Sequence, residues 1–144
     1  STYLNNFDDA VAGREAAIAL IRTGVDVLSH NADAAGLGVF RAATEFPGVY
    51  VIGSNKDQRS LAPDRVLGSA VIDLPRSFLL LAQEVKEGRF VPREESFGLD
   101  SGVLSWVPNP ALDSLLPSGF AARLAAAADS IKAGTLIAVR APPR

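Results

Sequence analysis

The 144-residue sequence contains no cysteine and no methionine, and it has one histidine and one tryptophan. The lack of cysteine excludes a disulfide, a thiol nucleophile and a thiolate metal site, and one histidine leaves little for a transition-metal centre. The 14 basic residues are scattered rather than gathered in a stripe, and the formal net charge is −2. We therefore expect no nucleic acid partner, because neutralising phosphates requires a basic surface.

Long hydrophobic runs are also missing. A helix that spans a bilayer needs about 20 consecutive apolar residues, and no stretch of this sequence approaches that length. Hydrophobic residues nonetheless make up 48% of the chain and charged residues 21%, a balance typical of a globular domain rather than of a disordered segment. The sequence begins at Ser1 with neither methionine nor a signal peptide, so we interpret it as a piece of a longer chain.

Hydrophobic residues recur alternately at helical and at strand spacing along most of the chain. Pro75 suits a first helical turn, and Gly24 and Gly134 suit helix C-termini. The pattern predicts helices within residues 10–24, 36–46, 75–88 and 117–134, strands at 25–28, 49–53, 66–72 and 135–139, and two more strands within 90–107 joined by a turn at Asp100 and Ser101. This alternation predicts an α/β fold with a mostly parallel sheet flanked by helices.

Two polar loops follow predicted strands, one at residues 29–33 and one at residues 54–58. In open parallel sheets, ligands bind at the carboxyl ends of the strands, where loops and helix N-termini converge. The two loops supply hydroxyl, imidazole, amide and carboxylate groups, which can hold a small polar molecule by directed hydrogen bonds. The alternative is that they are ordinary turns, since Asn, Asp and Ser favour turns for backbone reasons.

Individual residues in and near these loops allow more than one interpretation. His30 lacks an evident nucleophile or acid partner, so a ligand contact or a packed side chain is favoured over a general base. Gly36 and Gly38 open a helix as in anion sites, but they do not form a phosphate-loop or dinucleotide fingerprint. Trp106 has the flat ring needed to stack on a ligand, although aromatic residues in strands usually belong to the core. For Phe97, a place in the core is the favoured interpretation.

The order and spacing of several motifs resemble the second half of the basic-membrane-protein family, the substrate-binding lipoproteins of ABC transporters. The resemblance covers nearly the whole chain. Its motifs are Gly24–Leu28, Gly36–Ala43, Gly48–Gly53, Asp57-Gln58, Leu61–Asp64, Val66–Ser69, Val85–Phe90, Gly98–Val103 and Ile131–Thr135.

This resemblance implies a type I periplasmic-binding-protein fold, in which two hinged lobes close on a ligand. Residues 1–65 would then belong to the second, ligand-binding lobe, residues 66–90 would form the hinge crossing and a helix returning to the first lobe, and residues 91–144 would complete the lobes. The implied partners are a small-molecule ligand and an ABC permease and ATPase complex. The implied location is extracytoplasmic, either periplasmic or lipid-anchored at the cell membrane.

Characterised relatives bind purine nucleosides between aromatic side chains and hold the ribose through an aspartate and a lysine. This sequence departs from that pattern, because Ser29 stands at the aromatic position, Asn55 at the aspartate position and Asp100 at the lysine position. We therefore expect a small polar ligand, with a purine nucleoside or nucleobase-like compound favoured.

The sequence thus predicts a solute-binding component of an ABC importer that is not an enzyme and carries no cofactor or metal. A ligand-sensing regulatory module of the same fold is the main alternative, followed by an α/β enzyme. We also expect the isolated piece to associate with itself. The predicted ligand contacts are Ser29, His30, Asn31, Asp33, Asn55, Asp57, Asp100 and Trp106.

Overall fold

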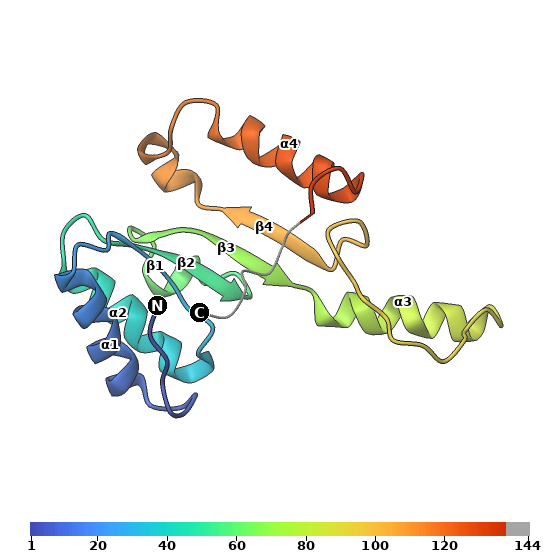
Figure 1. Cartoon of the computed structure of the whole chain (residues 1–144), viewed down its shortest axis with the longest axis horizontal. Coiled ribbons are helices and arrows are strands. Elements are labelled where there is room, and N and C mark those ends of the chain that lie inside the picture. Colours follow the sequence, from blue (N-terminus) through green and yellow to red (C-terminus); the bar gives the residue numbers. More distant parts are fainter. Residues whose placement is uncertain (138–144) are drawn as a thin grey trace. The chain divides into compact units, whose positions relative to one another are not determined.

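The computed structural model of the chain describes residues 1–137, and these form two compact units (Figure 1). The first unit comprises Ser1–Ile72 and Trp106–Ser114, and the second comprises Asp73–Ser105 and the residues from Leu115 onward. The apolar core belongs to the first unit, whereas the second unit consists largely of two helices.

The sheet has four strands in the order β1-β2-β3-β4, namely β1 (Val27–Ser29), β2 (Tyr50–Asn55), β3 (Val66–Ile72) and β4 (Leu104–Pro108). The first three strands are parallel, and Leu28 lies opposite Val51, which in turn lies opposite Val66. These three side chains are buried in the core. Just beyond the two ends of β4, the Asn109 N–H donates to the Leu67 carbonyl and the Val103 carbonyl accepts from the Asp73 N–H, so β4 runs antiparallel to β3.

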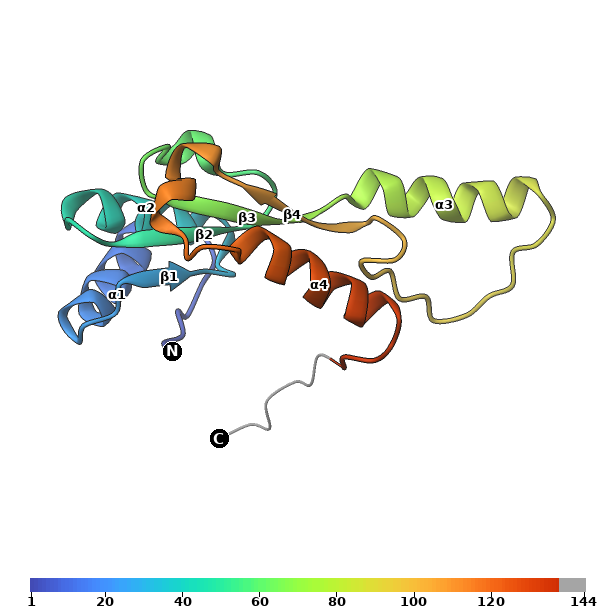
Figure 2. The ribbon, with the colours of Figure 1, turned by 90° about the horizontal axis from the view of Figure 1, so that it is seen from above.

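Helices α1 (Ala10–Arg22) and α2 (Gly36–Glu45) pack against each other on one face of the sheet (Figures 1 and 2). Asp9 caps α1, since its carboxylate accepts from the backbone N–H groups of Val11 and Ala12. The two helix backbones approach so closely at Gly38 that an added Cβ would overlap the backbone of α1. Glycine is therefore required at this crossing for steric reasons.

In the second unit, α3 (Leu74–Lys86) and α4 (Phe120–Lys132) contain no buried residue. Phe78 and Leu79 on α3 remain 69% and 67% exposed, and Val103 is the one apolar side chain that is buried in the described part of this unit. Most helical stability in proteins comes from packing an apolar face. These two helices therefore expose apolar side chains that packing against another segment or protein would stabilise.

The structure confirms the α/β prediction, with a mostly parallel sheet flanked by helices. The prediction of two strands within residues 90–107 is wrong in part, because the chain turns at residues 99–102 and only β4 forms, while residues 90–98 are irregular. That segment contains Pro92 and a run of charged residues, which favour irregular backbone over a strand. The last predicted strand is not formed at residues 135–137, and residues 138–139 lie outside the described part of the chain.

Candidate functional site

The two polar loops lie at the same edge of the sheet, because β1 and β2 are adjacent parallel strands that end at Ser29 and Asn55. Asn55 has a φ of 67° and Asp33 a φ of 46°, and both values lie in the left-handed region. Asn and Asp tolerate this conformation better than other non-glycine residues, and such backbone strain is concentrated at functional sites in proteins. The edge therefore has the local geometry expected of a binding site.

The buried side chain of Gln58 joins the ends of the strands. Its Oε1 accepts a hydrogen bond from the backbone N–H of Ser54 at 2.7 Å and lies 3.2 Å from Nε2 of His30. The backbone N–H of Gln58 donates to Oγ of Ser69 on β3 at 3.1 Å. Gly53 leaves room for this arrangement, since a Cβ there would overlap the Ser69 hydroxyl. One glutamine thus connects the residues at the ends of β1 and β2 with β3.

His30 is half-buried directly after β1. Its ring meets Phe40 of α2 edge-on, with 5.1 Å between the ring centroids, and Gly36 lies so close that a Cβ there would overlap the imidazole. Burial lowers the pKa of His30, and the hydrogen bond with Gln58 opposes that shift. The packing favours a neutral ring.

A pocket of about 460 Å³ opens beside this ring. Three of the residues predicted to bind ligand, Ser29, His30 and Asn31, contribute to its lining. The rest of the lining comes from the N-terminal segment, from α1, from Ala32 and from the core side chains of Leu28 and Val39. The pocket is thus largely apolar, with polar side chains contributed by both the N-terminal segment and the residues at the end of β1, a combination typical of small-molecule sites.

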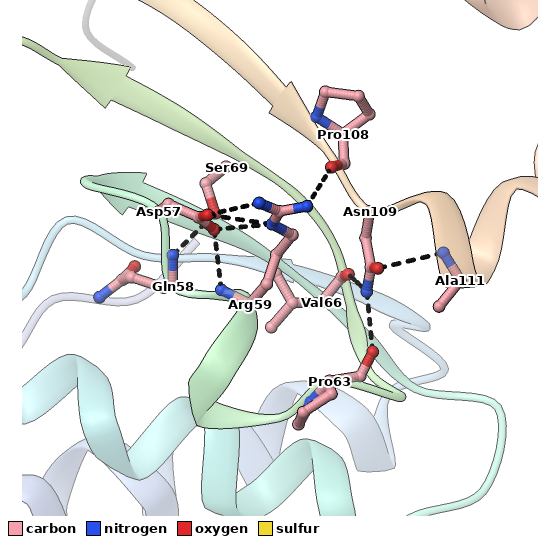
Figure 3. A network of polar contacts seen from close by, with 9 residues as sticks. All are labelled: Asp57, Gln58, Arg59, Pro63, Val66, Ser69, Pro108, Asn109 and Ala111. Carbon is pink, nitrogen blue, oxygen red and sulfur yellow. Dashed lines mark hydrogen bonds and ion pairs between the residues drawn. The ribbon is translucent and has the colours of Figure 1, made fainter.

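Asp57 is held by Arg59, two residues further on (Figure 3). The guanidinium Nη2 donates to the carboxylate at 2.7 Å, and Nε donates to it as well. This hydrogen bonding lowers the pKa of Asp57. Nη1 of Arg59 also donates to the Pro108 carbonyl at 3.1 Å, so the ion pair connects the loop after β2 with the end of β4.

Asn109 makes a second connection between β4 and the chain before β3 (Figure 3). Its Nδ2 donates to the carbonyls of Pro63 and Val66, each at 2.7 Å, and its Oδ1 accepts from the N–H of Ala111 at 3.2 Å. The residue is only 6% exposed. A buried amide with its donors and acceptor satisfied fixes the chain around it.

The other predicted contacts lie elsewhere. Trp106 on β4 packs its indole over Gly68 of β3, where a side chain would leave no space for the ring. Asp100 lies in the turn before β4, in the second unit. The structure therefore gathers Ser29, His30 and Asn31 with the loop of Asn55 and Asp57 at one edge, and Asp33 begins a short 3-10 helix beside them.

Sequence reasoning missed Gln58 and Asn109 as organising residues. Both are buried polar side chains in polar segments, and their burial is not visible in a sequence pattern. It also considered Gly36 and Gly38 for anion binding, whereas close packing against His30 and α1 explains both glycines. Within residues 1–137, no group of three or more His, Asp or Glu side chains is placed to hold a metal ion. No helix in the same range is long and apolar enough to cross a membrane.

Comparison with known proteins places the sequence in a family. Residues 1–117 match the family model described as Bmp, ABC transporter substrate-binding protein PnrA-like. The chain belongs to this family.

Among curated relatives, basic membrane protein A of Borreliella afzelii is 36% identical over 113 residues, which cover 76% of this chain and 35% of that protein. Basic membrane protein D of Borreliella burgdorferi strain JD1 is 43% identical over 72 residues, covering 49% of this chain and 21% of that protein. The chain thus spans about a third or less of the length of these relatives.

Solved structures show the same fold. A solute-binding protein of an ABC transporter system from Aeropyrum pernix K1 superposes with a TM-score of 0.80 at 20% identity, over 96% of this chain and 46% of that one. A transcriptional activator of the comK gene from Bacillus halodurans superposes with a TM-score of 0.82 at 22% identity, over 95% of this chain and 47% of that one. The chain therefore spans just under half of these structures.

Proposed function

We propose that this chain is the ligand-binding part of an extracytoplasmic solute-binding protein that serves an ABC importer and catalyses no reaction. The observation that carries the proposal is the joining of two polar loops at the carboxyl edge of a parallel sheet by the contacts of Gln58, in a chain of a substrate-binding family. Such an edge offers directed hydrogen bonds to one small molecule.

The charges of the loops favour a neutral polar ligand. Of the charged side chains in the two loops, Asp57 is paired with Arg59, and the other two, Asp33 and Lys56, are exposed and of opposite sign. The remaining polar side chains are hydroxyl, imidazole and amide groups. A purine nucleoside or nucleobase-like compound fits this chemistry, since it is uncharged and rich in donors and acceptors.

The exposed helices of the second unit support a two-lobed parent protein. We propose that residues 1–65 lie in the second lobe, that residues 66–90 cross the hinge and return to the first lobe, and that residues 91–144 complete both. In the parent protein, upstream residues would cover the apolar side chains of α3, such as Phe78 and Leu79. The chain's coverage of 35% of one curated relative leaves ample length for such a lobe.

The location and partners follow from the family. A substrate-binding protein delivers its ligand to a permease and ATPase complex, so we propose a periplasmic or lipid-anchored protein outside the cytoplasm. A sensing module is the second candidate, favoured by the fold shared with the transcriptional activator of Bacillus halodurans. Permease and ATPase genes beside the parent gene would favour transport, whereas a fused kinase or DNA-binding segment would favour sensing.

A thermal-shift screen of the full-length protein tests the proposal. Purine nucleosides and nucleobases should raise the melting temperature in a concentration-dependent manner, because a ligand that binds only the folded state stabilises it by mass action. Sugars and amino acids provide the comparison classes. Failure of all four classes to stabilise the protein would contradict the transport proposal.

Replacing His30 by alanine tests the position of the site in the same full-length protein. We expect ligand binding to weaken by about 1–3 kcal/mol, the range for leaving a buried polar partner unsatisfied, while the fold is retained. Arg22→Ala, at an exposed position near the end of α1, is the matched control and should bind as the parent does. Loss of folding with unchanged affinity per folded molecule would show that His30 serves only the core.

A further inference from the structure

The amide of Gln58 determines which nitrogen of His30 carries the proton. A backbone N–H can only donate, so the side-chain atom that receives the Ser54 N–H at 2.7 Å must be the amide oxygen. That same oxygen lies 3.2 Å from Nε2 of His30. Because an amide oxygen only accepts, Nε2 must carry the hydrogen that is shared between them.

The other ring nitrogen, Nδ1, leads to the same assignment. Nδ1 of His30 is buried without a hydrogen-bond partner, and it faces Gly36 at close range. A hydrogen on Nδ1 would therefore be a buried donor with no acceptor, which is rarer and more costly than an unused lone pair. Both nitrogens thus indicate a neutral ring in the Nε2–H form.

The connections of Gln58 reach the residues that the proposed function uses. His30 follows Ser29 and precedes Asn31 in the first loop, and Ser54 precedes Asn55 in the second. The Gln58 backbone is itself anchored to Ser69 of β3. The glutamine side chain therefore controls the spacing of the two loops without being exposed to a ligand, as its 7% exposure shows.

We propose that Gln58 is the positioning residue of the ligand site, which holds His30 as the neutral Nε2–H form and keeps the loops after β1 and β2 in register. The proposal rests on the proposed function, since it assigns the arrangement of that same site. It also makes the site sensitive to acid, because protonation would place an unpaired N–H on the buried Nδ1.

In this network, His30 is the titratable group, and the groups that contact its ring are uncharged. Gly36 and Phe40 of α2 and the amide of Gln58 contact it, and none of the three carries a charge. On the pocket side, the lining includes the phenol of Tyr3. The nearest acidic residues in sequence, Asp26 and Asp33, are exposed.

Nitrogen-15 NMR of histidine-labelled full-length protein tests the assignment without any ligand. His30 is the one histidine in these 144 residues, and its ring signals are identified by their loss in His30→Ala. We expect the Nε2–H pattern and a midpoint of titration below that of free imidazole in a peptide. An Nδ1–H pattern, or a midpoint at or above the peptide value, would overturn the proposal.

Two variants of Gln58 separate positioning from simple packing. Gln58→Glu keeps an acceptor for both donors and adds a negative charge, so the Nε2–H pattern should persist and the His30 titration should move to higher pH. Gln58→Met has similar length but no acceptor, and the preference for Nε2–H should be lost. Gln83→Met, at an exposed site on α3, is the matched control and should leave the ring signals unchanged.

Binding of adenosine and guanosine completes the test. Affinity should fall at least tenfold in Gln58→Met, be restored largely by Gln58→Glu at pH 8, and stay at the parent value in Gln83→Met. Parent-like affinity in Gln58→Met would overturn the positioning role. If no nucleoside binds the parent protein while the ring signals follow the expected pattern, the network is supported and the proposed ligand class fails, so the two failures are distinguishable.

Discussion

Replacing Asn109 by alanine removes the buried amide that connects the end of β4 with the chain before β3. The substitution eliminates two donated hydrogen bonds, to the carbonyls of Pro63 and Val66, and one accepted from Ala111. At about 1 kcal/mol net for each hydrogen bond, the free energy of unfolding should fall by about 3 kcal/mol. Because the bond to the Val66 carbonyl is buried, little of that part of the loss should be recovered from water.

Urea unfolding monitored by tryptophan fluorescence measures this effect. Trp106 is the single tryptophan of the chain, and it packs on Gly68 in the same unit as Asn109, so its emission reports on that unit. With an m value of about 2 kcal/mol per molar urea, the midpoint should fall by about 1.5 M. Asn5→Ala, in the exposed N-terminal segment, is the control and should shift the midpoint little.

A midpoint for Asn109→Ala equal to that of the control, at an unchanged m value, would contradict the prediction. Such a result would mean that the amide hydrogen bonds contribute nothing net to the stability of this unit. A second variant of the same residue sharpens the test. Asn109→Asp has the same shape but replaces the donor facing two carbonyls with an acceptor, so it should destabilise at least as much as alanine.

Four further outcomes are expected. Gly38→Ala should lower the free energy of unfolding of the first unit by about 1–3 kcal/mol or more, because the added Cβ overlaps α1. Gly48→Ala should lower it only by the strain of the positive φ at that position, about 1–2 kcal/mol. Urea midpoints measure both effects. Asp9→Ala should cost about 1 kcal/mol through loss of the α1 cap in the same assay. Burial lowers the folded-state pKa of His30. The contribution of the neutral ring to stability should therefore be fully present above the unfolded pKa of about 6.5, and it should be lost as the pH falls from that value toward the folded-state pKa. Urea titrations of wild type and His30→Ala at several pH values measure this loss. The 144-residue chain alone should bind nucleosides at least a hundredfold more weakly than the full-length protein, a difference in binding free energy of roughly 2.7 kcal/mol. Calorimetry measures both affinities. Equal affinities would place the whole site within these residues.

Much of the fold could be predicted from the sequence, because local patterns determine local elements. Asp9 and Gly24 mark the two ends of α1, and the strand predicted at residues 66–72 coincides with β3. The alternation of these elements was sufficient for the α/β class and the parallel sheet. The irregular segment at residues 90–98 shows the limit of such reasoning, since a scattered apolar pattern there did not produce a strand.

The sequence also indicated which loops carry the polar groups, because strand ends in a parallel sheet share one edge. Ser29 and Asn31 line a pocket beside His30, as expected for residues at the carboxyl end of β1. Their use by a ligand stays a prediction. The sequence did not reveal that Asp57 is occupied by Arg59, because an ion pair between neighbouring polar residues looks the same as two free charges until the side chains are placed.

The roles of the buried polar residues and of the close-packed glycines depend on the tertiary structure alone. Gln58 is one polar residue among several in its loop, and nothing local distinguishes it from its exposed neighbours. Its burial arises from contacts with residues 28 and 11 positions away in sequence, at His30 and Ser69. Glycine is likewise required at position 38 only because α1 approaches the backbone there. A sequence determines local conformation through short-range sterics and hydrogen bonding, whereas burial and backbone clearance depend on segments that meet only when the chain is folded.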